Sequence, residues 1–249
     1  MAETSIIKAG GMLDVKTGKL RGPVSIVIED GLIQSIDPST LPADATVIEL
    51  GDKVLLPGLM DMHTHLTLDF FTGDDWVTMP VLETAPDWAI RGVVFANLTL
   101  QAGFTTVRDV GANAGFPDVA LMRAINRGMV PGPRMWPAGH YISITGGGGD
   151  INFFSPEQEL IADGLIVDGV DEVRRAVREE IKYGGDWIKL MVTGAFMSAG
   201  DNPQNVHFSP EELEVAVAEL EAVFAGQNEK NYRDNPELQD IIQRILAQS

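Results

Sequence analysis

The alternation of apolar strand patterns with helix patterns constrains this chain more than any other feature of its sequence. From residue 58 onward, four segments have the short apolar pattern of strands: Leu59–His65, Thr105–Val110, Arg134–Ala138 and Trp187–Val192. Helix patterns follow them at residues 84–102, 117–127 and 171–183, and again from Ser209. Such alternation favours parallel βαβ units with right-handed crossovers. The expected fold class is therefore α/β.

The residues before this region have the pattern of a small β-sheet. Val24–Ile28 and Leu32–Ile36 are strand-like segments on either side of Asp30-Gly31, a pair typical of a tight hairpin turn. Pro57-Gly58 then ends the pattern. We expect a β-segment that is incomplete by itself.

The length of the chain limits how much of a barrel it contains. A complete (β/α)8 barrel takes about 250 residues, whereas 249 residues less the first 57 leave about 190. The sequence therefore predicts three parts. They are a β-segment over residues 1–57, an incomplete (β/α)8 TIM-like barrel of about four strands over 58–225, and a linker with a short amphipathic helix over 226–249.

Composition excludes several classes of function. Lys and Arg total 18 against 36 Asp and Glu, and a net charge of −18 disfavours binding to nucleic acid and to anionic membranes. Cysteine is absent, which excludes thiolate chemistry and disulfides. No secretory signal and no apolar run of about 20 residues is visible. We expect a cytoplasmic location.

Two histidines are the strongest candidates for chemistry. His63 and His65 stand two residues apart near the end of a predicted strand, so their side chains point to the same face. Imidazoles at the carboxyl end of a barrel strand are well placed to bind a divalent metal ion. Asp61 shares their face and is expected either to orient a ligand or to remain structural. Taken alone, the His-x-His pattern also fits two surface histidines in a turn.

Several motifs together resemble the amidohydrolase superfamily. They are Leu55-Leu-Pro-Gly-Leu-Met-Asp-Met-His-Thr-His65, Ala102-Gly-Phe-Thr-Thr-Val-Arg-Asp-Val-Gly111, Gly185-Asp-Trp-Ile-Lys-Leu-Met191 and Phe208-Ser-Pro-Glu-Glu-Leu213. The branch most similar to them contains imidazolonepropionase-like and Xaa-Pro dipeptidase-like hydrolases. The resemblance covers roughly residues 5 to 219, which is the N-terminal half of such a protein. It implies a β-sandwich joined to a distorted (β/α)8 barrel.

The resemblance also implies a metal centre and a reaction. His63, His65 and a Lys189 carboxylated by CO2 would hold one or two divalent ions, with zinc preferred. A metal-bound hydroxide would then hydrolyse a carbon–nitrogen bond in an amide, a lactam or a dipeptide-like small molecule. A lysine that extends its ammonium group to solvent from the strand end is the alternative for Lys189.

The remaining candidates are weaker. Asp109 and His140 follow the second and third predicted strands, where barrel enzymes bind substrates. Structural capping is the alternative for Asp109, and ordinary packing is the alternative for His140 and for His207. The segment Thr145-Gly-Gly-Gly-Gly-Asp150 is a glycine-rich loop. In the resembling branch this loop often contains a histidine where this chain has Gly148.

The resemblance implies more ligands than this sequence supplies. Family members take two further histidines from strands five and six and a general-base aspartate from strand eight. This sequence has four histidines and none follows His207, so no catalytic residue is assigned. We expect a truncated and inactive form of a hydrolase. The alternative is a non-catalytic half-barrel that forms a homo-oligomer or binds a partner through its open strand edges.

Overall fold

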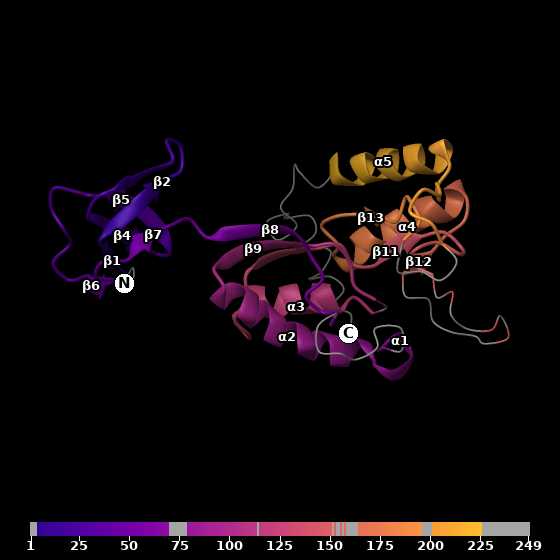
Figure 1. Ribbon diagram of the computed structural model, residues 1–249, viewed down its shortest axis with the longest axis horizontal. Helices are drawn as coiled ribbons and strands as arrows, with labels where there is room; N and C mark the ends of the chain where they lie inside the picture. Colours follow the sequence, from indigo (N-terminus) through magenta and orange to yellow (C-terminus); the bar gives the residue numbers. More distant parts are fainter. Residues whose placement is uncertain are drawn as a thin grey trace, which may run out of the picture. The chain divides into compact units, whose positions relative to one another are not determined.

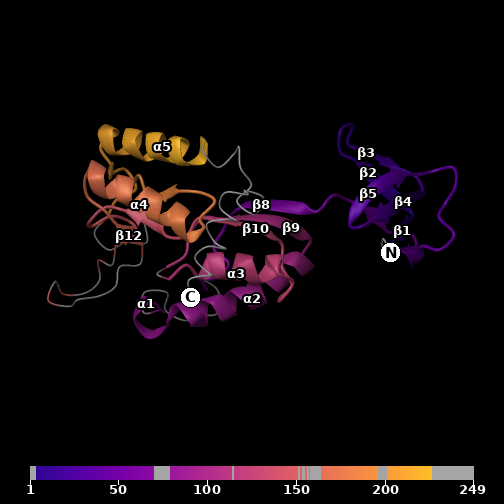
Figure 2. The ribbon, with the colours of Figure 1, turned by 180° about the vertical axis from the view of Figure 1, so that it is seen from behind.

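The computed structural model describes residues 4–69, 79–113, 115–150, 152, 155, 157, 164–195 and 201–225. The chain divides into two compact units, Met1–Gly58 and Leu59–Ser249. Figures 1 and 2 show the ribbon of the chain from opposite sides. Among the described residues, no helix has the length and apolar character needed to cross a membrane.

The first unit consists of two small sheets. One has four strands in the order β5-β4-β1-β6, and their bounds are Leu32–Ile36, Val24–Glu29, Thr4–Ala9 and Thr46–Glu49. The other has three strands in the order β3-β2-β7, which span Lys19–Arg21, Gly11–Asp14 and Val54–Leu55. Buried Ala9, Val24 and Ile26 form the core of this first unit.

The predicted hairpin of this unit is confirmed. β4 and β5 pair in antiparallel register on either side of Asp30 and Gly31. These two residues have φ angles of 50° and 78°. Positive φ at both central positions is the geometry of the two-residue turn that suits the twist of paired strands.

The second unit begins with three parallel strands covered by helices. β8 (Leu59–Thr64), β9 (Phe104–Asp109) and β10 (Arg134–Pro137) form a sheet in the order β10-β9-β8. The long helices that connect them, α2 (Ala85–Gln101) and α3 (Pro117–Asn126), lie together on one side of this sheet, as Figures 1 and 2 show. A short helix, α1 (Met79–Leu82), precedes α2. The core between sheet and helices contains Leu66, Ala96, Val107, Leu121 and Met135.

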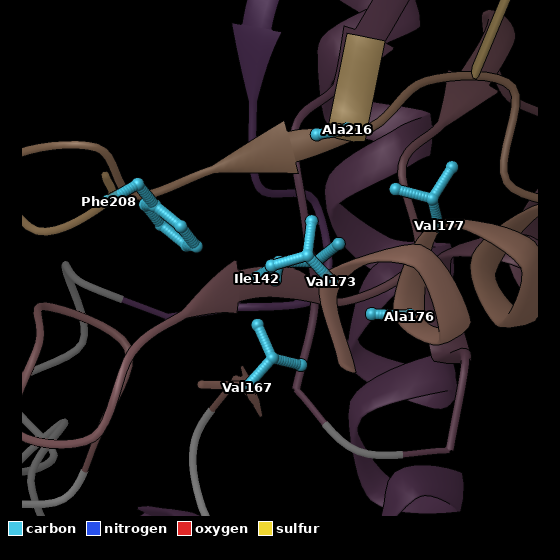
Figure 3. Close-up of a cluster of buried hydrophobic side chains, with 7 residues drawn as sticks. All are labelled: Ile142, Val167, Val173, Ala176, Val177, Phe208 and Ala216. Carbon is cyan, nitrogen blue, oxygen red and sulfur yellow. The ribbon is translucent and has the colours of Figure 1, made fainter. Parts of the chain in front are cut away.

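A second parallel sheet follows. β12 (Leu165–Ile166), β11 (Tyr141–Ser143) and β13 (Lys189–Leu190) lie in the order β12-β11-β13. The helices α4 (Val170–Tyr183) and α5 (Pro210–Ala225) pack against each other beside it. Figure 3 shows the buried cluster that joins these elements: Ile142, Val167, Val173, Ala176, Val177, Phe208 and Ala216.

The structure confirms the alternation of parallel strands and helices but changes several bounds. The helix expected at residues 84–102 begins after the N-cap Thr84 and ends at the C-cap Ala102. The fourth strand, expected at Trp187–Val192, is only Lys189–Leu190 and pairs with β11. β11 and β12 lie outside the four strand patterns of the sequence, because strands of two or three residues give no measurable periodicity. The helix expected in 226–249 lies outside the described residues.

Three buried carboxylates hold the chain where strands end. Asp109, Asp118 and Glu180 all have fully buried side chains. Asp118 Oδ2 accepts a hydrogen bond from the Gly139 backbone N–H at 2.8 Å, and Glu180 Oε2 accepts one from His140 N–H at 2.8 Å. Gly139 adopts φ 81°, and a Cβ there would collide with the Glu180 carboxylate. These bonds fix the turn that follows β10.

The same burial makes one of these groups sensitive to pH. Burial is the main cause that raises the pKa of Asp118. Hydrogen bonds from Gly139 and Val119 lower this pKa and the Glu180 charge raises it, and the net result is a pKa of about 7. The unfolded chain releases this proton near its ordinary pKa of 3.8. The stability that Asp118 contributes is therefore complete below about pH 4 and is lost as the pH rises through about 7.

Replacement of Asp118 by Asn tests this linkage. The variant carries no charge at any pH, so its stability should fall less than that of the wild type between about pH 5 and about pH 8. Urea unfolding midpoints measured across this range, with both proteins in the same buffers, give the comparison. Parallel midpoint curves for the two proteins would contradict the assignment.

Candidate metal centre

His63 and His65 lie together at the carboxyl end of β8. Their ring centroids are 5.5 Å apart and their planes meet at 65°, an edge-to-face arrangement. His63 is exposed and His65 is half-buried. The register between β8 and β9 shifts between Asp61 and Thr64, so this end of the strand is irregular. The two imidazoles nevertheless come to the same side, as their spacing predicts.

One hydrogen bond orients the His65 ring. His65 Nδ1 lies 2.8 Å from the Gly111 carbonyl oxygen. A carbonyl can only accept, so Nδ1 carries the proton and Nε2 is the nitrogen that a metal would use. Gly111 adopts φ 130°, and a Cβ at this position would lie 2.8 Å from Cδ1 of Tyr141. Glycine is therefore required where the chain turns to present this carbonyl.

The electrostatic surroundings favour neutral imidazoles. Burial lowers the pKa of His63, and the positive charges of Lys189 and Arg108 lower it further. Burial also lowers the pKa of His65. The hydrogen bond to Gly111 opposes this shift, and His63 and Lys189 add smaller contributions that lower the pKa. Metal ions bind the neutral form of histidine, so these shifts keep the ligand form available at neutral pH.

Lys189 belongs to the same neighbourhood. It is half-buried on β13, and its charge reaches both histidines. Burial lowers the pKa of Lys189, and the charge of Arg108 lowers it further. The structure therefore brings Lys189 close enough to both histidines for electrostatic interaction, although Lys189 lies 124 positions after His65 in the sequence.

Arg108 is the residue that the sequence analysis missed. Its Nε donates a 2.7 Å hydrogen bond to the Met62 carbonyl oxygen, and its guanidinium carbon lies 5.4 Å from the ring centroid of Trp187. It thus connects β9 to the backbone next to His63 and to the segment that enters β13. A charged residue inside the apolar pattern Thr105–Val110 was the available signal.

The acidic candidates have backbone partners. Asp61 Oδ1 accepts a 3.0 Å hydrogen bond from the backbone N–H of His63. Asp109 is fully buried, and its Oδ2 accepts from the Leu66 backbone N–H at 2.7 Å and from Thr64 Oγ1 at 3.2 Å. Asp109 therefore bonds the end of β8, and its contact with substrate stays a prediction.

The other two histidines each pair with a carboxylate. His140 Nδ1 lies 2.8 Å from Glu180 Oε1, and its ring meets the ring of Phe116 edge-on at 4.4 Å. His207 Nε2 lies 3.2 Å from Asp201 Oδ1, and its backbone N–H donates to Val192 O just beyond β13. Both residues therefore lie at the carboxyl ends of strands.

The residues present make up part of a metal site. Among the described ranges, no group of three or more His, Cys, Asp or Glu side chains gathers closely enough to bind an ion. His63 and His65 supply two nitrogen ligands, and zinc centres in proteins have at least three protein ligands. A carboxylated Lys189 would add an oxygen ligand. The chemistry of this set fits a divalent metal ion.

Comparison with known proteins agrees with this architecture. The amidohydrolase family matches residues 54–225, well over half of the chain. Ochratoxinase from Aspergillus niger is 35% identical over 239 residues, covering 88% of this chain and 48% of that protein. The chain spans about half the length of such relatives, which is consistent with the N-terminal half expected from the motifs.

Solved structures give the same result. A Xaa-Pro dipeptidase with methionine in its active site has a TM-score of 0.79 and 33% identity, over 89% of this chain and 55% of that one. A prolidase in complex with N-methylphosphonate-L-proline has a TM-score of 0.76 and 32% identity, over 88% of this chain and 54% of that one. With parallel βα units, paired histidines and these matches, the chain belongs to the amidohydrolase family.

Proposed function

We propose that this chain carries the metal-binding part of a hydrolase that cleaves a carbon–nitrogen bond in a small molecule. The observation that carries the proposal is the His63–His65 pair, with rings 5.5 Å apart and His65 Nδ1 bound to the Gly111 carbonyl. The similar proteins support the bond type, since they include a Xaa-Pro dipeptidase and a prolidase. The substrate class is an amide, a lactam or a dipeptide-like compound.

His63, His65 and a carboxylated Lys189 would hold one or two divalent ions, with zinc as the preferred metal. Such an ion polarises a carbonyl group as a Lewis acid and lowers the pKa of water. The chain's own residues prepare the site. Gly111 fixes the tautomer of His65, while burial and nearby cations keep both imidazoles neutral.

The surroundings of Lys189 support its carboxylation. The neutral amine forms a bond with CO2 and releases a proton, which yields an anionic carbamate. Burial and the Arg108 charge favour the neutral amine that this addition needs. The product exchanges a cation for an anion beside Arg108, so two repelling cations become an attractive pair.

His140 is our candidate for substrate contact. Its Nδ1 is engaged by the buried carboxylate of Glu180, which leaves Nε2 as the nitrogen for a substrate. Its backbone pairs with Ala112, the residue after the Gly111 carbonyl that orients His65. No histidine follows His207 in this sequence, so the two later histidine ligands of the family have no counterpart there. Hydrolysis by these 249 residues alone is therefore not expected.

Removal of both imidazoles tests the metal site. The purified protein should bind zinc, and the double variant His63→Ala, His65→Ala should lose that binding because only Lys189 remains of the proposed ligand set. Zinc content after dialysis, measured by atomic emission, gives the result. His207→Gln, which removes a histidine paired with Asp201, is the matched control and should retain metal. Full zinc content in the double variant would disprove the assignment.

Carbonate dependence tests the role of Lys189. Zinc affinity of the wild type should rise when bicarbonate is added to a CO2-depleted sample near pH 8, because the carbamate supplies an oxygen ligand. Lys189→Met should bind more weakly and show no response to bicarbonate. A carbamate signal in the ¹³C NMR spectrum of protein treated with ¹³C-bicarbonate is the direct check. An equal response of the wild type and the methionine variant would exclude this lysine.

A second candidate function, a self-associating half-barrel, is favoured by exposed apolar surface on α2. Ile90, Val94 and Leu98 stand four residues apart, on one face of the helix, and are 69%, 55% and 54% exposed. Within the part of the chain that the structure describes, β8 pairs only with β9. Exposed apolar stripes and unpaired strand edges are each typical of interaction surfaces.

Light scattering coupled to size exclusion tests self-association. The wild type should elute as a dimer or a larger assembly at micromolar concentration, and Val94→Asp together with Leu98→Asp should shift it to monomer. Val217→Asp, at a residue 54% exposed on α5, is the matched control and should leave the assembly intact. A monomeric wild type would rule out this second function.

A further inference from the structure

We propose that Asp109 is the positioning residue of the metal centre, which holds His65 in place without binding the ion itself. The inference rests on the proposed function, because it assigns His65 as a metal ligand. It concerns the backbone on either side of that histidine. Asp109 would act through Thr64 and Leu66, the two neighbours of His65 in sequence.

The contacts of Asp109 enclose His65. One carboxylate oxygen, Oδ2, accepts hydrogen bonds from the Leu66 backbone N–H at 2.7 Å and from the Thr64 hydroxyl at 3.2 Å. The next residue of the same strand end adds a backbone bond, from Val110 N–H to Thr64 O at 2.9 Å. Gly111 then binds the imidazole itself. Three consecutive residues of the β9 end thus hold the three residues centred on His65.

The irregular end of β8 explains why a side chain is needed. Register between β8 and β9 shifts between Asp61 and Thr64, so the regular ladder is interrupted at the metal-ligand candidates. Side chains of β9 bind the backbone within this interruption and just beyond the end of β8. Arg108 Nε donates to Met62 O at 2.7 Å, and Asp109 accepts from Leu66 N–H. The histidine pair is fixed between these two bonds.

The cost of burying Asp109 argues for a specific role. The Asp109 side chain is fully buried, and the donors around it are neutral: the backbone N–H groups of Leu66 and Gly111 and the Thr64 hydroxyl. Burial of a carboxyl group among neutral donors is destabilising. Core packing alone would be better served by an apolar residue. The Gly111 carbonyl orients the His65 ring directly, and Asp109 adds to this by holding the backbone on either side of that ring.

The expected effect is on metal affinity more than on folding. Loss of the carboxylate leaves the Leu66 N–H without this acceptor and leaves the Thr64 hydroxyl with the Arg108 carbonyl oxygen, 3.3 Å away, so the backbone that carries His65 gains freedom. Partners of this kind typically change metal affinity by about ten- to a hundredfold. The Gly111 bond to the ring remains, so binding should weaken without disappearing.

The experiment compares zinc dissociation constants of Asp109→Ala, Asp109→Asn and the wild type by competition with a chromophoric chelator. Asp109→Ala should bind about tenfold or more weakly. Asp109→Asn keeps one oxygen for the two donors and should recover most of the affinity. Far-UV circular dichroism and urea unfolding report folding in parallel. Thr64→Val removes one hydrogen-bond donor and keeps the side-chain shape, so it should show a smaller loss of zinc affinity. It serves as the test if Asp109→Ala does not fold.

Asp118→Asn is the matched control, since Asp118 is equally buried but bonds Gly139 and Val119 instead of β8. Its zinc affinity should stay within about twofold of the wild type even where its stability changes. Wild-type affinity in Asp109→Ala, or in Thr64→Val if the first does not fold, would overturn this inference and leave the metal site intact. An equal loss in Asp118→Asn and Asp109→Ala would overturn it too. Failure of the wild type to bind zinc would instead overturn the proposed function.

Discussion

The hydrogen bond between His65 Nδ1 and the Gly111 carbonyl is the interaction on which the candidate site depends. It exists because β8 and β9 are parallel neighbours whose carboxyl ends meet at one edge of the sheet. The strand ladder alone would not hold this edge, since the register is interrupted next to the histidines. Side chains of Arg108 and Asp109 replace the missing ladder bonds. Rigidity at this site therefore comes from β9.

Charge is arranged in two layers around this edge. Cationic Arg108 and Lys189 lie near the imidazoles and lower the pKa of His63. The buried carboxylates of Asp109 and Glu180 instead bind backbone groups that follow β8 and β10. The basic residues keep the imidazoles neutral, and Arg108 favours an uncharged Lys189. The buried acidic residues fix the turns after β8 and β10. Addition of CO2 to the lysine would give this electropositive layer an anion, which is the charge that a bound cation requires.

Local signals predicted the helices and the histidine pair well. Helix α2 begins after Thr84 and ends before Ala102, as expected. The i, i+2 spacing places His63 and His65 on one side. Elements that depend on distant partners were not predictable. β11 and β12 have two or three residues and exist only because each pairs with another segment. The roles of Arg108 and Asp109 depend on contacts 43 to 46 residues away in the chain, which no local pattern encodes.

X-ray absorption at the zinc edge of the metal-loaded protein tests the central claim most directly, because it reports the ligand atoms themselves. The account predicts imidazole scattering from two histidines, with nitrogen ligands near 2.0–2.1 Å, together with oxygen ligands at about the same distance. Loss of the imidazole signal in the His63→Ala, His65→Ala variant would complete the assignment. A zinc shell built entirely of oxygen in the wild-type protein would contradict it, because the ion would then be bound by surface carboxylates instead of the β8 histidines.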